Sequence, residues 1–94
     1  MSGLSEHGPD MRYFFNVRSG RGLVRDLEGA EYATSEDARV EALSVARELV
    51  GRQLIGGDAV DWGAVIEIHQ DDGRSAGTVG FLEAAGLPAN LYGA

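Results

Sequence analysis

The chain has 94 residues, no cysteine and a formal net charge of −7 at pH 7. This length supports one domain with a modest core, and the lack of cysteine excludes disulfides and thiolate chemistry. All eight basic residues are arginines, and Arg12, Arg18, Arg21 and Arg25 occur in a stretch that contains no acid. No apolar run is long enough to cross a membrane, and the first residues lack the pattern of a secretion signal. We therefore expect a cytoplasmic protein with an uneven distribution of charge and no contact with a membrane.

Composition divides the chain into three parts. Residues 1–10 are mostly small, polar or charged, which predicts a disordered tail. Residues 11–85 carry regular apolar patterns, which predict a single α+β domain. Residues 86–94 begin at Gly86, are interrupted by Pro88 and are predicted to be a frayed C-terminal tail.

The first part of the domain has the pattern of antiparallel strands. Residues 12–18 alternate, with Tyr13, Phe15 and Val17 on one side. Residues 19–22 supply a turn, and residues 23–26 return as a second strand. Asp26 and Gly29 occupy the first and fourth positions of a predicted type I turn. Residues 30–33 lead into the next element as a possible short third strand.

Residues 34–55 are predicted to form one long amphipathic helix. Thr34 or Ser35 can cap its first turn with a side-chain oxygen, and Glu36 and Asp37 favour the positive end of the helix dipole. Apolar and small residues recur at spacings of three and four, which places them on one face: Ala38, Ala42, Val45, Ala46, Leu49, Val50 and Gln53. The small side chains allow the helix to lie close to a sheet. The glycine pair at 56–57 ends it.

The remaining pattern predicts a second pair of strands. Residues 64–70 alternate, the turn at 71–74 contains a glycine, and residues 78–82 return as a weak or bulged strand. Residues 83–85 can add a helical turn.

These elements predict an α+β fold of the ββαββ type: an antiparallel sheet with one long helix packed on one face. The expected core is Tyr13, Phe15, Val17, Val45, Leu49, Ile66, Ile68, Val79 and Phe81. If one helix covers the sheet, the opposite face stays open. The side chains expected there are Arg12, Phe14, Asn16, Arg18, Val65, Glu67 and His69.

The sequence matches the known motifs of catalytic, cofactor-binding and metal-binding sites poorly. The cluster Asp58, Asp61, His69, Asp71 and Asp72 lacks the spacing of a calcium loop and the ligands of a zinc site. The glycines around Arg21 are not followed by a third glycine and a helix, as a dinucleotide site requires. No serine has a histidine at a motif-like position. We expect no catalytic site, no metal and no cofactor, and hence a protein that is not an enzyme.

The open face instead suggests binding. The leading hypothesis is a small non-enzymatic protein-interaction or regulatory module that uses the open sheet face or an edge strand to bind a protein partner or to form a homodimer. The candidate surface is Arg12, Phe14, Asn16, Arg18, Arg21, Val65 and His69. The alternative is nucleic-acid binding through the arginine-rich hairpin, which the negative net charge opposes. A third hypothesis is a small-ligand site under Trp62.

Three segments resemble a family of short uncharacterised bacterial proteins. Residues 12–18 read RYFFNVR, residues 26–31 read DLEGAE and residues 38–43 read ARVEAL. Members of that family open with an R-Y-F-F-x-V strand, carry a D-x-E-G turn and continue into an alanine-rich helix. The resemblance extends over about residues 11–82. It implies this fold and no particular activity.

The chain is also similar, more loosely, to HicB-like antitoxin domains. The likeness lies in an N-terminal hairpin followed by a helix that opens with Thr34-Ser35-Glu36-Asp37-Ala38. It implies neutralisation of a toxin by a small acidic domain. The chain departs from that pattern because it lacks a proline-rich turn before the helix and a DNA-binding segment after the sheet, so autoregulation is not implied.

Overall fold

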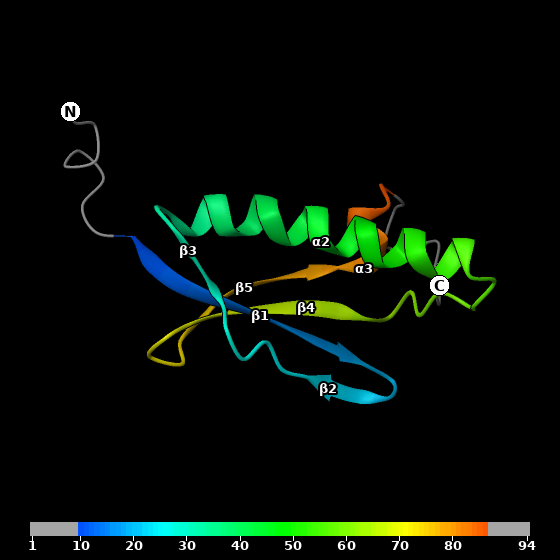
Figure 1. Ribbon diagram of the computed structural model, residues 1–94, viewed down its shortest axis with the longest axis horizontal. Coiled ribbons are helices and arrows are strands. Elements are labelled where there is room, and N and C mark those ends of the chain that lie inside the picture. The colour runs from blue at the N-terminus through cyan, green and yellow to red at the C-terminus, as the bar shows by residue number, and fades with distance from the viewer. Residues whose placement is uncertain (1–9, 87–94) are drawn as a thin grey trace.

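The computed structural model describes residues 10–86, which form an α+β domain with one long helix over an antiparallel sheet (Figure 1). This confirms the predicted fold class. The elements, in chain order, are β1 (Met11–Ser19), β2 (Gly22–Val24), β3 (Ala30–Tyr32), α2 (Ser35–Ile55), β4 (Val65–Gln70), β5 (Ser75–Gly80) and α3 (Phe81–Ala84). The expectations for both tails concern mainly residues that lie outside the described part of the chain.

The sheet is organised around β1. Its order is β2-β1-β4-β5, and β3 also pairs with β1. β2 and β3 share one edge of β1, because β2 pairs with its last residues and β3 with its first residues. β4 pairs along most of the other edge, with Phe14 opposite His69 and Arg18 opposite Val65. The register between β4 and β5 shifts at Ile68 and His69, which agrees with the bulge predicted for this strand pair.

The long helix begins and ends close to the predicted residues. Thr34 is the N-cap, and its Oγ1 accepts a hydrogen bond from the Asp37 amide at 3.0 Å. The chain leaves the helix through Gly56, and Gly57 has a φ of +79°, the left-handed conformation that favours glycine. Between these ends, Ala38, Ala42 and Ala46 are fully buried against the sheet. Their spacing of four residues and their small size let the backbone of α2 lie close to the strands.

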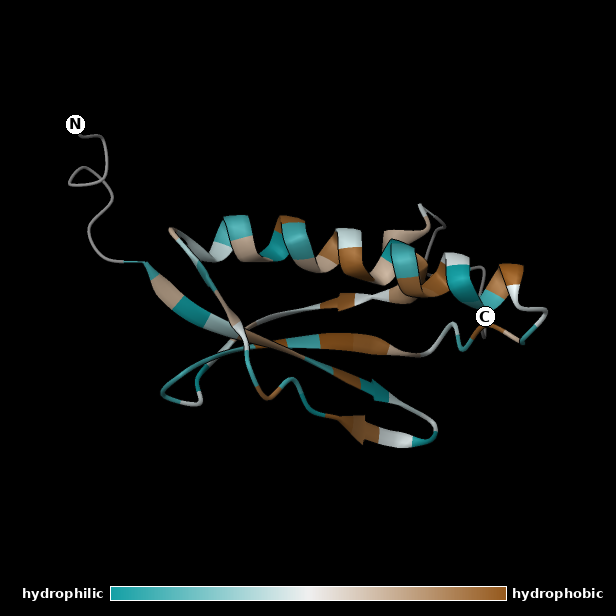
Figure 2. Ribbon diagram, in the orientation of Figure 1, coloured by the Kyte–Doolittle hydropathy of each residue, from teal (hydrophilic) through white to brown (hydrophobic). Residues whose placement is uncertain are grey.

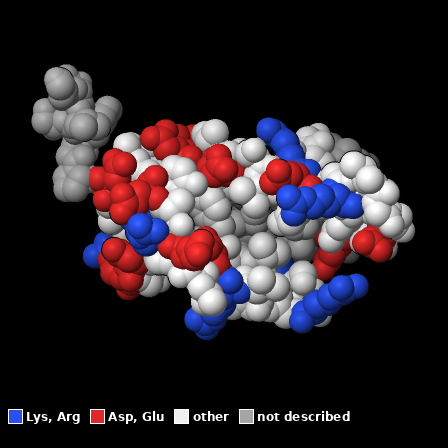
Figure 3. Space-filling view, in the orientation of Figure 1, with Lys and Arg blue, Asp and Glu red and all other residues white. Residues whose placement is uncertain are grey.

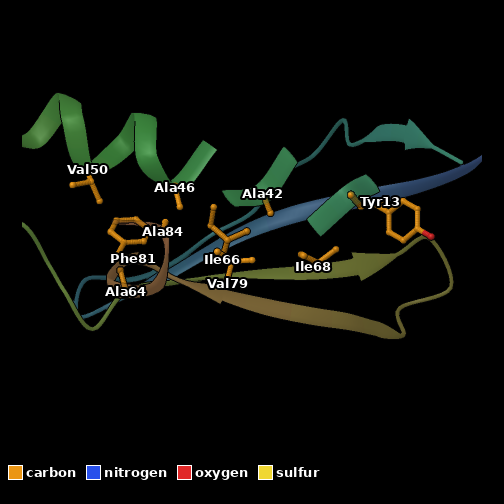
Figure 4. Close-up of a cluster of buried hydrophobic side chains, with 11 residues drawn as sticks. Tyr13, Ala42, Ala46, Val50, Ala64, Ile66, Ile68, Val79, Phe81 and Ala84 are labelled. Carbon is orange, nitrogen blue, oxygen red and sulfur yellow. The ribbon is translucent and has the colours of Figure 1, made fainter. Parts of the chain in front are cut away.

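The core fills the space between α2 and the sheet, with α3 at one end, and Figure 4 shows the side chains of both layers pointing into it. In Figure 2 the hydrophobic part of β4 is interrupted by a hydrophilic band, and α2 alternates between polar and apolar residues, as elements with one covered face should. The buried residues are Tyr13, Ala38, Ala42, Ala46, Val50, Ala64, Ile66, Ile68, Val79, Phe81 and Ala84. Of the expected core residues, Phe15, Val17, Val45 and Leu49 are only partly buried.

The last strand differs from the prediction. β5 covers Ser75–Gly80, so it starts earlier than expected, and Phe81 and Leu82 begin the short helix α3 instead of ending the strand. Phe81 is 2% exposed, and its amide donates to the Ala64 carbonyl. The turn into α3 therefore directs Phe81 into the core end of the domain, which strand alternation would also have allowed.

Two arginines of α2 bind to this C-terminal region and hold it against the helix. Arg39 donates to the Thr78 carbonyl on β5 at 3.0 Å and forms an ion pair with Glu83. Arg47 donates to the Ala84 carbonyl at 2.8 Å. Neither contact has a local signal in the sequence, since each joins residues that are far apart along the chain. Within residues 10–86, no helix has the length and apolar character needed to cross a membrane.

Candidate interaction surface

Within residues 10–86, no helix covers the sheet face opposite α2, and this face is hollowed at the level of β1 and β4. The hollow has a volume of about 520 Å³. We call it the open-face hollow. Its lining is Phe14, Asn16, Arg18, Leu23, Arg25, Asp26, Leu27, Glu67, His69, Gln70, Asp71 and Gly73.

One wall of the hollow is built by the loop between β2 and β3. The Asp26 carboxylate accepts hydrogen bonds from the amides of Phe15 at 3.1 Å, Gly29 at 3.0 Å and Glu28 at 3.2 Å. The Asp26 amide in turn donates to Asn16 Oδ1 at 2.9 Å. The Asp26 side chain thus takes the place of a strand partner in the middle of β1, where neither β2 nor β3 reaches. This explains why β2 ends at Val24, before the predicted Asp26.

These contacts also set the charge of Asp26. Partial burial opposes ionisation, but the hydrogen bonds from Gly29, Phe15 and Glu28 outweigh it and lower the pKa of the carboxyl. Asp26 is therefore ionised and keeps its negative charge beside the hollow. Its carboxylate oxygens already accept hydrogen bonds from three backbone amides.

Gly29 brings the loop into contact with the sheet. Its φ is +66°, and a Cβ at this position would lie 2.7 Å from the Tyr13 carbonyl oxygen and 2.9 Å from the Phe14 ring. A side chain is therefore excluded twice, by backbone conformation and by space. The shape of this wall therefore explains why aspartate and glycine occupy the first and fourth positions of the predicted turn.

The Arg18–Glu67 ion pair crosses the floor of the hollow, and His69 lies beside it. The Glu67 carboxylate lies 2.5 Å from Arg18 Nε and 3.5 Å from His69 Nε2. The hydrogen bond and charge of Arg18, with a smaller effect of His69, lower the pKa of Glu67, and the same hydrogen bond raises the pKa of Arg18. The acid on the floor is therefore neutralised by its neighbours.

The rim of the hollow offers groups without such partners. Leu27 is 85% exposed, and Leu23 stands opposite Arg18 in the strand register and is partly buried. Arg25 is exposed and forms no ion pair within residues 10–86. Figure 3 shows many acidic side chains towards the end of the molecule where α2 begins, with arginines both among them and near the opposite end. The available chemistry of the rim is thus apolar with a free cation.

The structure brings some predicted residues together and separates others. Phe14, Asn16, Arg18 and His69 all line the hollow. Val65 is opposite Arg18 in the register of β1 and β4 and lies outside the lining.

The two remaining predicted residues are arginines that lie away from the hollow. Arg12 forms an ion pair with Glu31 at 3.2 Å and donates to the Glu28 carbonyl at 2.7 Å. Arg21 lines a different cleft, beside the C-terminal half of α2.

Sequence reasoning missed Leu23, Arg25 and Leu27 as parts of this surface. Leu23 could have been found from the hairpin register, because a turn at residues 20–21 places it opposite Arg18 on the open side. Arg25 and Leu27 follow the end of β2, where strand alternation no longer applies. Their position depends on the hydrogen bonds of Asp26, which no local sequence pattern predicts.

The aspartates considered as metal ligands have structural contacts. Asp72 Oδ1 accepts the Arg74 amide at 2.9 Å in the β4–β5 turn, and Asp61 accepts the amides of Gly20 and Gly63, each at 3.0 Å. Among the described residues, no group of three or more His, Asp or Glu side chains could hold a metal ion.

Comparison with protein families decides the membership of the chain. A family model described as a domain of unknown function, DUF6894, matches residues 12–82, which contain nearly all of the sheet and the whole of α2. The chain belongs to the DUF6894 family. The description assigns no activity, in agreement with the expected uncharacterised family. No significant similarity to a curated protein or to a solved structure was found.

Proposed function

We propose that this DUF6894 domain is a non-enzymatic binding module that holds a protein partner in the open-face hollow. The observation that carries the proposal is the exposed Leu27 and the free Arg25 on the rim of a rigid sheet face that α2 leaves uncovered. Leu27 is 85% exposed, and Arg25, which lines the same hollow, forms no ion pair within residues 10–86. An exposed apolar side chain and a cation on one surface are typical of a site that a partner covers.

Charge indicates the chemistry of the partner. The charge of Glu67 is offset by Arg18, whereas Asp26 accepts only neutral backbone amides and stays an anion. Among the groups of the rim, Arg25 would gain the most favourable interaction from a carboxylate of the partner. A partner that presents an apolar side chain beside an acidic group complements the rim.

The open face is a better candidate than an edge strand. β2 and β3 have three residues each, too few for extended strand addition. On β5, Arg39 already occupies the outward-facing Thr78 carbonyl, and Gly77 has a φ of +125° that interrupts the regular edge. Short and obstructed edges resist pairing with another chain.

The arginine-rich hairpin lends little support to nucleic-acid binding. Arg12 and Arg18 are engaged by Glu31 and Glu67 of the same chain. A phosphate would have to displace these carboxylates and approach a chain with a net charge of −7. Protein binding therefore remains the function that we propose.

The test compares surface variants that should not disturb folding. Leu27→Asp and Arg25→Glu change exposed groups on the rim, and Ile55→Asp is the matched control because Ile55 is 90% exposed at the far end of α2. Tagged wild type and variants are used to capture partners from the native host, and the proteins are compared by sedimentation to detect a second copy as the partner. We expect both rim variants to lose the partner or the dimer and Ile55→Asp to keep it.

Two results would contradict the proposal. One is a partner that binds wild type and both rim variants equally, since the hollow would then play no part. The other is a monomer that captures no protein at all. Salt-sensitive capture of nucleic acid that depends on Arg21 would instead support the hairpin alternative.

A further inference from the structure

A second cleft lies on the other side of the sheet, between the C-terminal half of α2, the β1–β2 hairpin and the loop that precedes β4. Its volume is about 510 Å³, which falls within the usual range for small-molecule sites. It is separate from the open-face hollow, since the two linings share no residue. We call it the helix-end cleft.

Loop contacts hold the walls of the cleft in place. Asp61 Oδ2 accepts the Gly20 amide from the hairpin at 3.0 Å, and Asp61 Oδ1 accepts the Gly63 amide at 3.0 Å. One side chain therefore ties the hairpin to the loop on the opposite wall. A cleft fixed in this way requires little ordering when a ligand binds, which favours affinity.

The interior of the cleft is apolar. Its walls include Leu49 from α2, Val17 and Val24 from the hairpin, and Val60 from the loop, with Phe81 and Ala64 from the core. Val24 pairs with Val17 on the face that α2 covers, yet it is 68% exposed because the helix does not extend over β2. An apolar ligand body would cover this exposed surface.

Two opposite charges line the same cleft. Arg21 and Asp58 are both exposed, and neither forms an ion pair within residues 10–86. The other acid of the lining, Asp61, has both oxygens occupied by amides. Gln53 also lines the cleft, and its Oε1 is buried without a hydrogen-bond partner. Residues 10–86 supply no donor for this buried acceptor.

We propose that the helix-end cleft binds a free amino acid with a large apolar side chain. The side chain would lie against Val17, Leu49 and Phe81, the carboxylate would pair with Arg21, and the ammonium group would pair with Asp58. Arginine binds carboxylates through two parallel hydrogen bonds, and an ammonium group supplies the donors that an aspartate accepts. This site goes beyond the protein-binding role proposed for the open face.

The experiment follows backbone amide signals of the full isotope-labelled chain during titration with L-phenylalanine and L-leucine. N-acetyl-L-phenylalanine, which lacks the ammonium group, and L-phenylalanine amide, which lacks the carboxylate, are the comparison ligands. We expect both free amino acids to shift signals of the cleft lining and each comparison ligand to bind about tenfold more weakly. Peptide ends would behave like one of the two blocked ligands, so the same series separates them from a free amino acid.

Charge variants then assign the two contacts. In Arg21→Gln, we expect L-phenylalanine and its amide to bind equally weakly, and in Asp58→Asn we expect L-phenylalanine and its N-acetyl form to do so. Arg25→Gln and Asp71→Asn are matched controls, because both residues line the open-face hollow instead. Leu27→Asp should also leave amino-acid binding unchanged, so failure of this proposal and failure of the proposed function give different results.

The inference would be overturned if saturating amino acid shifted no signal of the cleft lining. It would equally be overturned if the blocked ligands bound as well as the free amino acids, or if Arg21→Gln and Asp58→Asn behaved like their controls.

Discussion

At the scale of single residues, Asp26 organises more of the candidate surface than any residue that could contact a partner. Its carboxylate joins the middle of β1 to the loop that carries Leu27, and Gly29 allows that loop to touch the Phe14 ring. The side chains on the rim are thus positioned by the backbone contacts of Asp26. A substitution at Asp26 should therefore change binding through the position of the loop.

Asp26→Asn should therefore destabilise the fold in a pH-dependent way. The amide keeps the shape but replaces one acceptor oxygen with a donor that faces a backbone N–H, which costs about 1–2 kcal/mol at neutral pH. Because the pKa of Asp26 is lowered in the folded state, its stabilisation is present above the unfolded pKa and is lost as the pH falls through the folded value. The difference in unfolding free energy between wild type and variant should shrink over that interval.

Urea unfolding at a series of pH values measures this difference. Asp71→Asn is the control, because Asp71 is an exposed turn residue. A gap that stayed constant down to the lowest pH would show that the ionised carboxylate is not the source of the stabilisation.

At the scale of elements, the sequence predicts those features that local pattern determines. The limits of α2 follow from Thr34 and the glycine pair at 56–57, and the two faces of β1 follow from strict alternation. Local pattern does not predict the early end of β2 or the helix at Phe81–Ala84, because both depend on contacts with residues that are remote in the chain. The same holds for the candidate surface: its strand residues were predictable from the alternation, and its loop residues were not.

The alanine stripe of α2 leads to a prediction about packing. Ala42 is fully buried where the helix meets the sheet, so a leucine there has no space without moving the helix. Ala42→Leu should destabilise the domain by about 1–3 kcal/mol in spite of the greater hydrophobicity of the new residue. Ser44→Leu, on the exposed side of the same helix, is the matched control and should change stability by roughly 0.5 kcal/mol or less.

Chemical denaturation of the two variants checks this expectation, with far-ultraviolet circular dichroism to show that the helix is retained. If Ala42→Leu were as stable as wild type, α2 would have to stand further from the sheet than the buried alanines indicate.

At the scale of the whole molecule, charge acts in two opposing ways. The ion pairs Arg12–Glu31, Arg18–Glu67 and Arg39–Glu83 join separate parts of the fold, yet all three are exposed to solvent. Exposed pairs of this kind stabilise a protein by about 0–1 kcal/mol each, and salt weakens them. The excess of acids, which gives the net charge of −7, instead repels itself over the whole surface, and salt relieves that repulsion.

Self-repulsion should prevail at neutral pH, because each ion pair removes only one acid while the excess carboxylates act on one another at longer range. Adding sodium chloride to about 0.1 M, where the screening length is about 10 Å, should therefore raise the Tm by a few degrees. Near the isoelectric point of about 4.6 the excess charge vanishes and only the ion pairs remain sensitive to salt. The same addition should then leave the Tm unchanged or lower it. Scanning calorimetry at both pH values decides the matter: a Tm that falls with salt at neutral pH would mean that the ion pairs, and not the acidic excess, dominate the electrostatics of this fold.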